Sequence, residues 1–121
     1  MLRSIFFSVS IALGTMVPFA AEAGPSCGLA SFYGGYGDGF AGMTMANGKR
    51  MNPQAMISAH RSLPLGSRIR VTNQGNGKSV VVTISDRGPW YGNRVLDLSL
   101  GAFARVASPS QGIAKVCIAK A

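Results

Sequence analysis

Acidic residues are scarce in this 121-residue sequence, which has 4 Asp and Glu against 12 Lys and Arg and a formal net charge of +8. Histidine occurs once, as His60. After position 23 the acids are Asp38, Asp86 and Asp97, and there is no glutamate. Acid–base chemistry near neutral pH would therefore have to use one of these side chains.

Several catalytic and metal-binding motifs are also missing. No Ser-His-Asp order is recognisable and there is no H-E-x-x-H element, so the sequence gives no support to a serine hydrolase or a zinc peptidase. Its 2 cysteines, Cys27 and Cys117, and the distant His60 do not form a recognisable cluster of metal ligands. We therefore expect no metal site.

Residues 1–23 have the pattern of a secretory signal peptide. Arg3 supplies a positive charge, a long apolar run follows, and the small-residue pattern AEA suits cleavage after Ala23. A transmembrane anchor is the alternative, but the apolar run is short for a membrane span and contains Pro18. We expect an exported protein, in the periplasm or outside the cell, whose mature part, residues 24–121, is one domain.

Export would allow Cys27 and Cys117 to form a disulfide. The bond would close a loop of roughly 90 residues, for which chain entropy predicts a stabilisation of about 4 kcal/mol. Two free thiols are the alternative, and they would be unusual in an oxidising compartment. Cys27 could also carry a lipid, but the preceding residues 24–26 lack the Leu and small-residue pattern of such a site. We expect a disulfide and no lipid anchor.

The positive charge survives removal of the signal peptide, because Arg3 and Glu22 are lost together. A surface this basic favours an anionic partner. Nucleic acid fits poorly, because export separates the protein from it and the sequence shows no recognition helix or aromatic RNA motif. An anionic cell-wall polymer fits better. We expect a monomer that is not inserted in the membrane after signal removal.

Short runs rich in β-branched residues dominate the mature chain. Residues 67–73 alternate, with Ile69 and Val71 on one face, and residues 79–85 form a second such run. Between them, Asn76-Gly77 favours a tight turn, because both residues can adopt positive φ, so 67–85 is predicted as a hairpin. Further strands are expected at 28–33, 94–99 and 112–119.

Helical signals are few. Residues 99–107 suit a short helix with Ser99 as the N-cap, and 52–59 could begin with one helical turn. The glycine-rich stretch 34–42 is predicted as a loop. Many short strands with glycine-rich turns indicate a small β-barrel or β-sandwich, and termini joined by a disulfide suit a barrel.

Asp86 and Asp97 are the first candidates for chemistry. Asp86 ends an apolar strand and enters the rigid sequence DRGP, a position that suits a cleft. Asp97 lies between Leu96 and Leu98 and should point away from both. Each has a structural alternative: Asp86 could accept backbone N–H bonds in the turn, and Asp97 could pair with a nearby arginine. His60 likewise could be structural.

Aromatic residues flank these segments. Phe32, Tyr33, Trp90 and Tyr91 could offer exposed rings beside carboxylates, which suits stacking against sugar rings. Ordinary core packing is the alternative, and it is the favoured interpretation for Phe32.

The motifs ASFYG, TMANGKRMN, SAHRSLPLG, TISDRGPW, RVLDLS and GIAKVCI, in this order, resemble the rare lipoprotein A family of bacterial lytic transglycosylases. The resemblance runs from about Gly28 to Cys117. It implies a mainly β fold, a six-stranded double-psi β-barrel with one or two short helices and a glycan groove. It also implies cleavage of peptidoglycan glycan strands between N-acetylmuramic acid and N-acetylglucosamine, giving 1,6-anhydro products without a cofactor.

The resemblance assigns roles to individual residues. Asp86 matches the family's catalytic aspartate and His60 its functionally important histidine, while Asp97 matches a groove aspartate of related barrels. With one acid that first donates and then accepts a proton, the reaction does not need the paired carboxylates of ordinary glycosidases. We expect Tyr33, Arg87 and Trp90 to contact the glycan.

Lys49 departs from the family pattern, in which an acidic residue usually follows ANG. If Lys49 reaches the groove as a further contact to the glycan, its charge would favour the ionised form of Asp86 and make it a poorer general acid. The alternative function is a non-catalytic, expansin-like module that binds or loosens the wall. A secreted inhibitor or interaction protein on the same barrel is a third.

Overall fold

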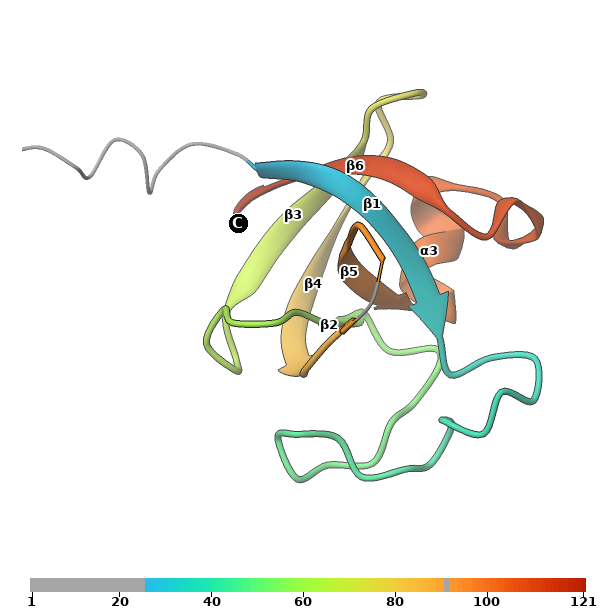
Figure 1. Ribbon diagram of the computed structural model, residues 1–121, viewed down its shortest axis with the longest axis vertical. Helices are drawn as coiled ribbons and strands as arrows, with labels where there is room; N and C mark the ends of the chain where they lie inside the picture. Colours follow the sequence, from blue (N-terminus) through green and yellow to red (C-terminus); the bar gives the residue numbers. More distant parts are fainter. Residues whose placement is uncertain (1–25, 91) are drawn as a thin grey trace, which may run out of the picture.

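A computed structural model describes residues 26–90 and 92–121 (Figure 1). The expected signal peptide, the boundary of the mature domain and Tyr91 lie outside the described residues. The described part contains strands β1 (Ser26–Tyr33), β2 (Ile57–Ala59), β3 (Arg68–Asn73), β4 (Ser79–Asp86), β5 (Arg94–Ser99) and β6 (Ala114–Lys120), the helix α3 (Leu100–Val106) and the 3-10 turn η3 (Pro109–Gln111). None of its helices is long and apolar enough to cross a membrane.

The six strands of the described residues form a closed barrel in the order β1-β5-β2-β4-β3-β6, and β6 pairs with β1 to complete it. The pairs β1–β5 and β2–β4 are parallel, whereas the other neighbours are antiparallel. Figure 1 shows β1 and β6 crossing the same side of the molecule. The predicted six-stranded barrel with a short helix is confirmed, and the sandwich alternative is wrong.

Apolar and polar residues alternate along the strands, and the apolar side chains fill the interior of the barrel. On β3, Ile69 and Val71 are buried, whereas Arg68 and Arg70 are exposed, as a period of two residues requires. α3 contributes Phe103 and the other buried side chains of its inner face to the same core. The predicted cap is confirmed, because the Ser99 hydroxyl accepts a 3.1 Å bond from the N–H of Ala102.

The stretch 52–59 differs from its prediction. Asn52 does accept a 2.9 Å bond from the N–H of Gln54, as a helix start would, but the chain makes only a turn and then enters strand β2. β2 has three residues and is inserted between β4 and β5. Pairing with β4 and β5 decides its extended conformation. A strand of three residues is too short to show a period of two residues in the sequence.

The hairpin of β3 and β4 is confirmed, but its turn is longer than a tight two-residue turn. Asn73 and Lys78 close it with a 2.8 Å backbone hydrogen bond. Gly77 has φ of 76°, whereas Asn76 uses its side-chain amide to donate a 2.9 Å bond to the carbonyl of Val106. The Asn-Gly pair therefore ties the turn to α3.

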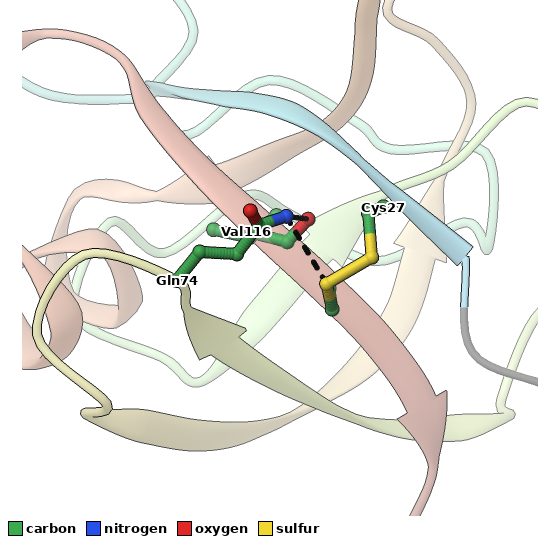
Figure 2. Close-up of a disulfide and its surroundings, with 4 residues drawn as sticks. Cys27, Gln74 and Val116 are labelled. Carbon is green, nitrogen blue, oxygen red and sulfur yellow. Dashed lines mark hydrogen bonds between the residues drawn. A yellow bond between two sulfur atoms is a disulfide. The ribbon is translucent and has the colours of Figure 1, made fainter.

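The predicted disulfide between Cys27 and Cys117 is present and joins residues 90 positions apart (Figure 2). The two cysteines are direct register partners on β1 and β6. The bond therefore links the first and last strands at the place where the barrel closes.

Candidate functional site

A groove of about 400 Å³ is lined by the last residues of β1, β2 and β4, by Asp97 of β5 and by the 40–51 loop. Its polar lining consists of Tyr33, Thr44, Asp86, Arg87 and Asp97. Its apolar lining includes Phe40, Met43, Met45, Met51, Ala59, Pro89 and Trp90. The structure therefore brings together Asp86, Asp97, Tyr33, Arg87 and Trp90 of the predicted site.

The Asp86 carboxylate is held by three hydrogen bonds. Its Oδ1 atom accepts from the backbone N–H groups of Ala46 and Arg87, each at 2.9 Å. Its Oδ2 atom accepts from the hydroxyl of Tyr33 at 2.9 Å. The structural alternative for Asp86 is thus correct, and it coexists with a place in the groove. These contacts fix the orientation of the carboxylate relative to the groove.

Tyr33 is buried rather than exposed, which corrects the expected open ring. Burial raises the pKa of the Tyr33 hydroxyl far above its ordinary value, and the charge of Asp86 and the hydrogen bond to it act in the same direction. Tyr33 therefore stays protonated and remains a donor to Asp86. Its ring packs edge-on against Phe40 at 5.6 Å between centroids.

Asp97 lies on the outer face of β5, and Leu96 and Leu98 point into the core, as the alternation predicts. The hydroxyl of Ser31 donates a 2.9 Å bond to its Oδ1 atom. Burial raises the pKa of Asp97, whereas the Ser31 bond and the charge of Arg94 oppose that rise. Asp86 and Asp97 line the same groove, so the scarce carboxylates of this basic chain converge there.

Asp38 shapes the glycine-rich loop beside the groove. Its carboxylate accepts from the N–H groups of Gly34 at 2.8 Å and Phe40 at 3.0 Å. Its charge contributes to the raised pKa of Asp97. The prediction that 34–42 is a loop is confirmed, and Asp38 helps to hold the conformation of this loop.

His60 is not one of the residues that line the groove. Its Nδ1 atom accepts from the N–H groups of Ser62 at 3.0 Å and Leu63 at 2.9 Å. Burial lowers the pKa of His60, and the charges of Arg87 and Arg61 lower it further. The neutral ring therefore carries its proton on Nε2. Its backbone N–H donates to the carbonyl of Asp86 at 3.1 Å.

Two arginines tie the His60 turn to the segment after Asp86. Nη1 of Arg87 donates to the carbonyls of His60 at 3.2 Å and Leu63 at 2.7 Å. Arg61 donates to the carbonyl of Pro89. These bonds hold together two loops, and one of them carries Trp90 at the edge of the groove.

The rim of the groove is apolar. Trp90 is 70% exposed, Met43 57% and Phe40 51%. Trp90 was predicted, but Phe40 and the methionines were missed. The sequence feature that could have indicated them is the unusual number of apolar residues in and just after the glycine-rich loop. Phe32, by contrast, packs against Phe103 at 5.0 Å between centroids, as the core interpretation predicts.

Lys49 is exposed and does not line the groove. It belongs to a turn in which its carbonyl accepts from the N–H of Met45 at 2.8 Å. The neighbouring Ala46 in that turn donates to Asp86. The structure therefore places the backbone of Lys49 close to the site, while its side chain faces solvent.

In residues 26–90 and 92–121, no three His, Cys, Asp or Glu side chains lie close enough together to hold a metal ion. What the groove does offer is an oriented carboxylate, a second half-buried carboxyl group and an aromatic rim. This combination can exchange a proton with a bound molecule that has both polar groups and flat apolar faces.

The closed barrel with these parallel and antiparallel pairs is a double-psi β-barrel. The family model described as lytic transglycolase matches residues 25–118, and the chain belongs to this rare lipoprotein A-like family.

Relatives with assigned names are longer. The chain is 58% identical over 91 residues to the probable endolytic peptidoglycan transglycosylase RlpA of Nostoc sp., covering 75% of this chain and 24% of that protein. It is 43% identical over 104 residues to the endolytic peptidoglycan transglycosylase RlpA of Rickettsia felis, covering 86% and 46%. The chain thus spans less than half of these proteins. An uncharacterized Synechocystis protein is 51% identical over 85 residues, covering 70% and 90%.

Solved structures share the fold. The Streptomyces papain inhibitor superposes with a TM-score of 0.61 at 20% identity, covering 79% of this chain and 93% of that one. An expansin of Clavibacter michiganensis in complex with cellohexaose gives 0.62 at 21% identity, covering 80% and 50%.

Proposed function

We propose that this protein is an exported lytic transglycosylase that cleaves the glycan strands of peptidoglycan. The observation that carries the proposal is the Asp86 carboxylate, held in the groove by three donors in a chain of the lytic transglycolase family. Relatives named peptidoglycan transglycosylase support the choice of substrate. The disulfide supports an oxidising compartment, and it occupies the Cys27 sulfur that a lipid anchor would need.

Asp86 would act first as an acid and then as a base. Its Oδ1 atom already accepts two bonds, whereas Oδ2 accepts only the bond from Tyr33, so Oδ2 has room for a proton. The protonated acid gives that proton to the glycosidic oxygen as the C–O bond breaks. The resulting carboxylate then takes the proton of the sugar's C6 hydroxyl as this oxygen bonds to C1, which closes the 1,6-anhydro ring.

The other residues would bind or position. Trp90 and Phe40 offer exposed rings for the faces of sugar units, and Asp97 and Arg87 offer polar contacts along the groove. Tyr33 orients Asp86 through its hydroxyl. His60 would act as a positioning residue, because its ring holds the turn whose carbonyls bind Arg87.

The test is digestion of glycan strands that lack stem peptides, with mass spectrometry of the products. We expect fragments with 1,6-anhydro ends from the wild-type protein and none from Asp86→Asn, with the thermal midpoint of the variant showing that it is folded. Equal product from both proteins, or hydrolysed ends without anhydro ends, would show that the assignment is wrong.

A second candidate is a non-catalytic module that binds the cell wall. It is favoured by the exposed basic residues of two neighbouring strands, Arg68 and Arg70 on β3 and Lys115 and Lys120 on β6. It is also favoured by Lys49 in place of the family's usual acid. This function predicts that the protein sediments with purified peptidoglycan, that salt weakens the binding, and that no anhydro product forms.

A further inference from the structure

The disulfide is accessible from outside the barrel. Cys117 points outward between Val116 and Ile118, which are buried in the core, and is itself only partly buried. Its partner Cys27, near the start of β1, is exposed. A shallow hollow beside the bond is lined by Cys27, Gln74 and Lys115 among others. A thiol reagent can therefore approach the bond from the Cys27 side.

Gln74 donates a hydrogen bond to one of the two sulfur atoms, so their surroundings differ (Figure 2). Its Nε2 atom donates to Sγ of Cys117 at 3.1 Å and to the carbonyl of Val116 at 3.4 Å. Its backbone N–H donates to the carbonyl of Lys115 at 2.9 Å, which fixes the residue against β6. Among the described contacts, Cys117 has this amide donor whereas Cys27 has no such donor.

A donor on one sulfur gives thiol–disulfide exchange a direction. The reaction is fastest when the attacked sulfur is accessible and the departing thiolate is stabilised. An N–H group already aimed at Cys117 stabilises negative charge as it develops there, and no rearrangement is needed.

We propose that the Cys27–Cys117 bond is a directed exchange site for thiol reductants, in which Cys27 is attacked and Cys117 leaves. The thiolate of the reductant bonds to Sγ of Cys27, the S–S bond breaks, and its electron pair stays on Cys117 as a thiolate that Gln74 stabilises. With a dithiol, the second thiolate then attacks the mixed disulfide. Cys27 is released as a thiolate, and the reductant becomes a cyclic or intramolecular disulfide.

The site is separate from the groove. Cys27 stands near the start of β1 and Tyr33 at its end, roughly 20 Å apart along an extended strand. The β1–β6 ladder also pairs residues on both sides of the cysteines, from Ser26–Ile118 to Ala30–Ala114. Exchange therefore changes the bond that ties the barrel's first and last strands without requiring the strands to part. It does not depend on the proposed glycan chemistry.

The first test maps the adduct on the wild-type protein. The oxidised full chain is treated with glutathione, quenched with acid at early times and alkylated, and its peptides are analysed by mass spectrometry. We expect glutathione on Cys27 and the alkyl group on Cys117. Adducts in equal amounts, or mainly on Cys117, would overturn the proposal.

The second test measures the rate of reduction by dithiothreitol. Gln74→Met keeps the length of the side chain but removes its N–H donor, and we expect reduction roughly tenfold slower than in the wild type. Gln111→Met is the matched control, because Gln111 donates to the carbonyl of Ile113 and is not part of the hollow. A wild-type rate for Gln74→Met, or the same slowing in the control, would contradict the proposal.

Discussion

The hydroxyl of Tyr33 and the carboxylate of Asp86 meet at 2.9 Å, although the two residues lie 53 positions apart in the sequence. They stand at the ends of β1 and β4, which are not neighbours in the barrel. Tyr33 is buried and its pKa is raised, so its hydroxyl stays protonated at ordinary pH and can donate to Asp86. The orientation of the proposed acid therefore depends on a side chain from a distant strand.

Removal of that donor should slow catalysis more than it weakens binding. In Tyr33→Phe the ring and its packing against Phe40 remain. The bond to Asp86 is lost, together with the long 4.0 Å contact of the hydroxyl with the Met45 sulfur. A hydrogen bond to a charged group is worth about 1.5 to 3 kcal/mol, so we expect kcat to fall by at least tenfold with KM nearly unchanged. Kinetics of anhydro-product release measure both. A rise in KM at constant kcat would instead mean that Tyr33 contacts the glycan directly.

Asp97 should make stability depend on pH. Its pKa in the folded protein lies above the ordinary value of 3.8, mainly because of burial. The folded state thus holds this proton more tightly than the unfolded chain, so the stabilisation is present below 3.8 and is lost as pH rises through the folded pKa. Asp97→Asn keeps an oxygen for Ser31, and we expect a higher thermal midpoint than wild type at pH 7 but not at pH 3. Equal differences at both pH values would contradict this origin.

His60 should be replaceable by a residue that keeps its acceptor. Asn places an oxygen close to the position of Nδ1, so His60→Asn can still accept from Ser62 and Leu63, whereas His60→Ala cannot. We expect the Ala variant to lose about 1 to 2 kcal/mol of unfolding free energy and most activity, and Asn to restore much of both. Urea unfolding and product assays test this. A stable but inactive Asn variant would give the ring itself a catalytic role.

Acidification supplies an independent check on His60. Its pKa in the folded state lies below the ordinary 6.5, so its contribution to stability is present above 6.5 and is lost as pH falls through the folded value. The thermal midpoint of His60→Asn should therefore fall less than that of the wild type between pH 7 and pH 5. Parallel curves would show that other groups dominate this range.

Lys49→Glu should raise lytic activity severalfold. The change introduces the acidic side chain that the sequence resemblance leads us to expect in this turn, next to the Ala46 N–H that holds Asp86. Because Lys49 is exposed, its replacement should change the thermal midpoint little. Lys78→Glu, an exposed charge reversal in the β3–β4 turn, is the matched control and should leave activity unchanged. Equal activity of Lys49→Glu and the wild type would show that Lys49 does not limit the reaction.

Much of the barrel could be predicted from sequence because its strands alternate. The pattern of 67–73, with Ile69 and Val71 inward, is a local property of the chain. β2 could not be found in this way, because Ile57–Ala59 is too short to show a period and is set by pairing with β4 and β5. The Asn76-Gly77 turn was also misjudged, since contact with Val106 in α3 decides the use of Asn76.

The site could be predicted only in part. Asp86 was marked by its place at the end of a strand and by the DRGP motif, and Asp97 by alternation. The burial of Tyr33, and its bond to Asp86, depend on how β1 and β4 meet across the barrel. His60 does not line the groove, and its Nδ1 atom instead accepts bonds from the turn at Ser62 and Leu63. Contacts between residues so far apart in the chain cannot be inferred from local sequence patterns.

Closure of the barrel by β1 and β6 has a practical consequence. The start of β1 and the end of the chain lie on the same side of the molecule (Figure 1), while the groove forms where β1, β2 and β4 end. A tether, an affinity handle or a fused domain joined at either end would thus leave the groove open. The barrel could be immobilised on a bead or a surface by either end and still present Asp86 to a long polymer.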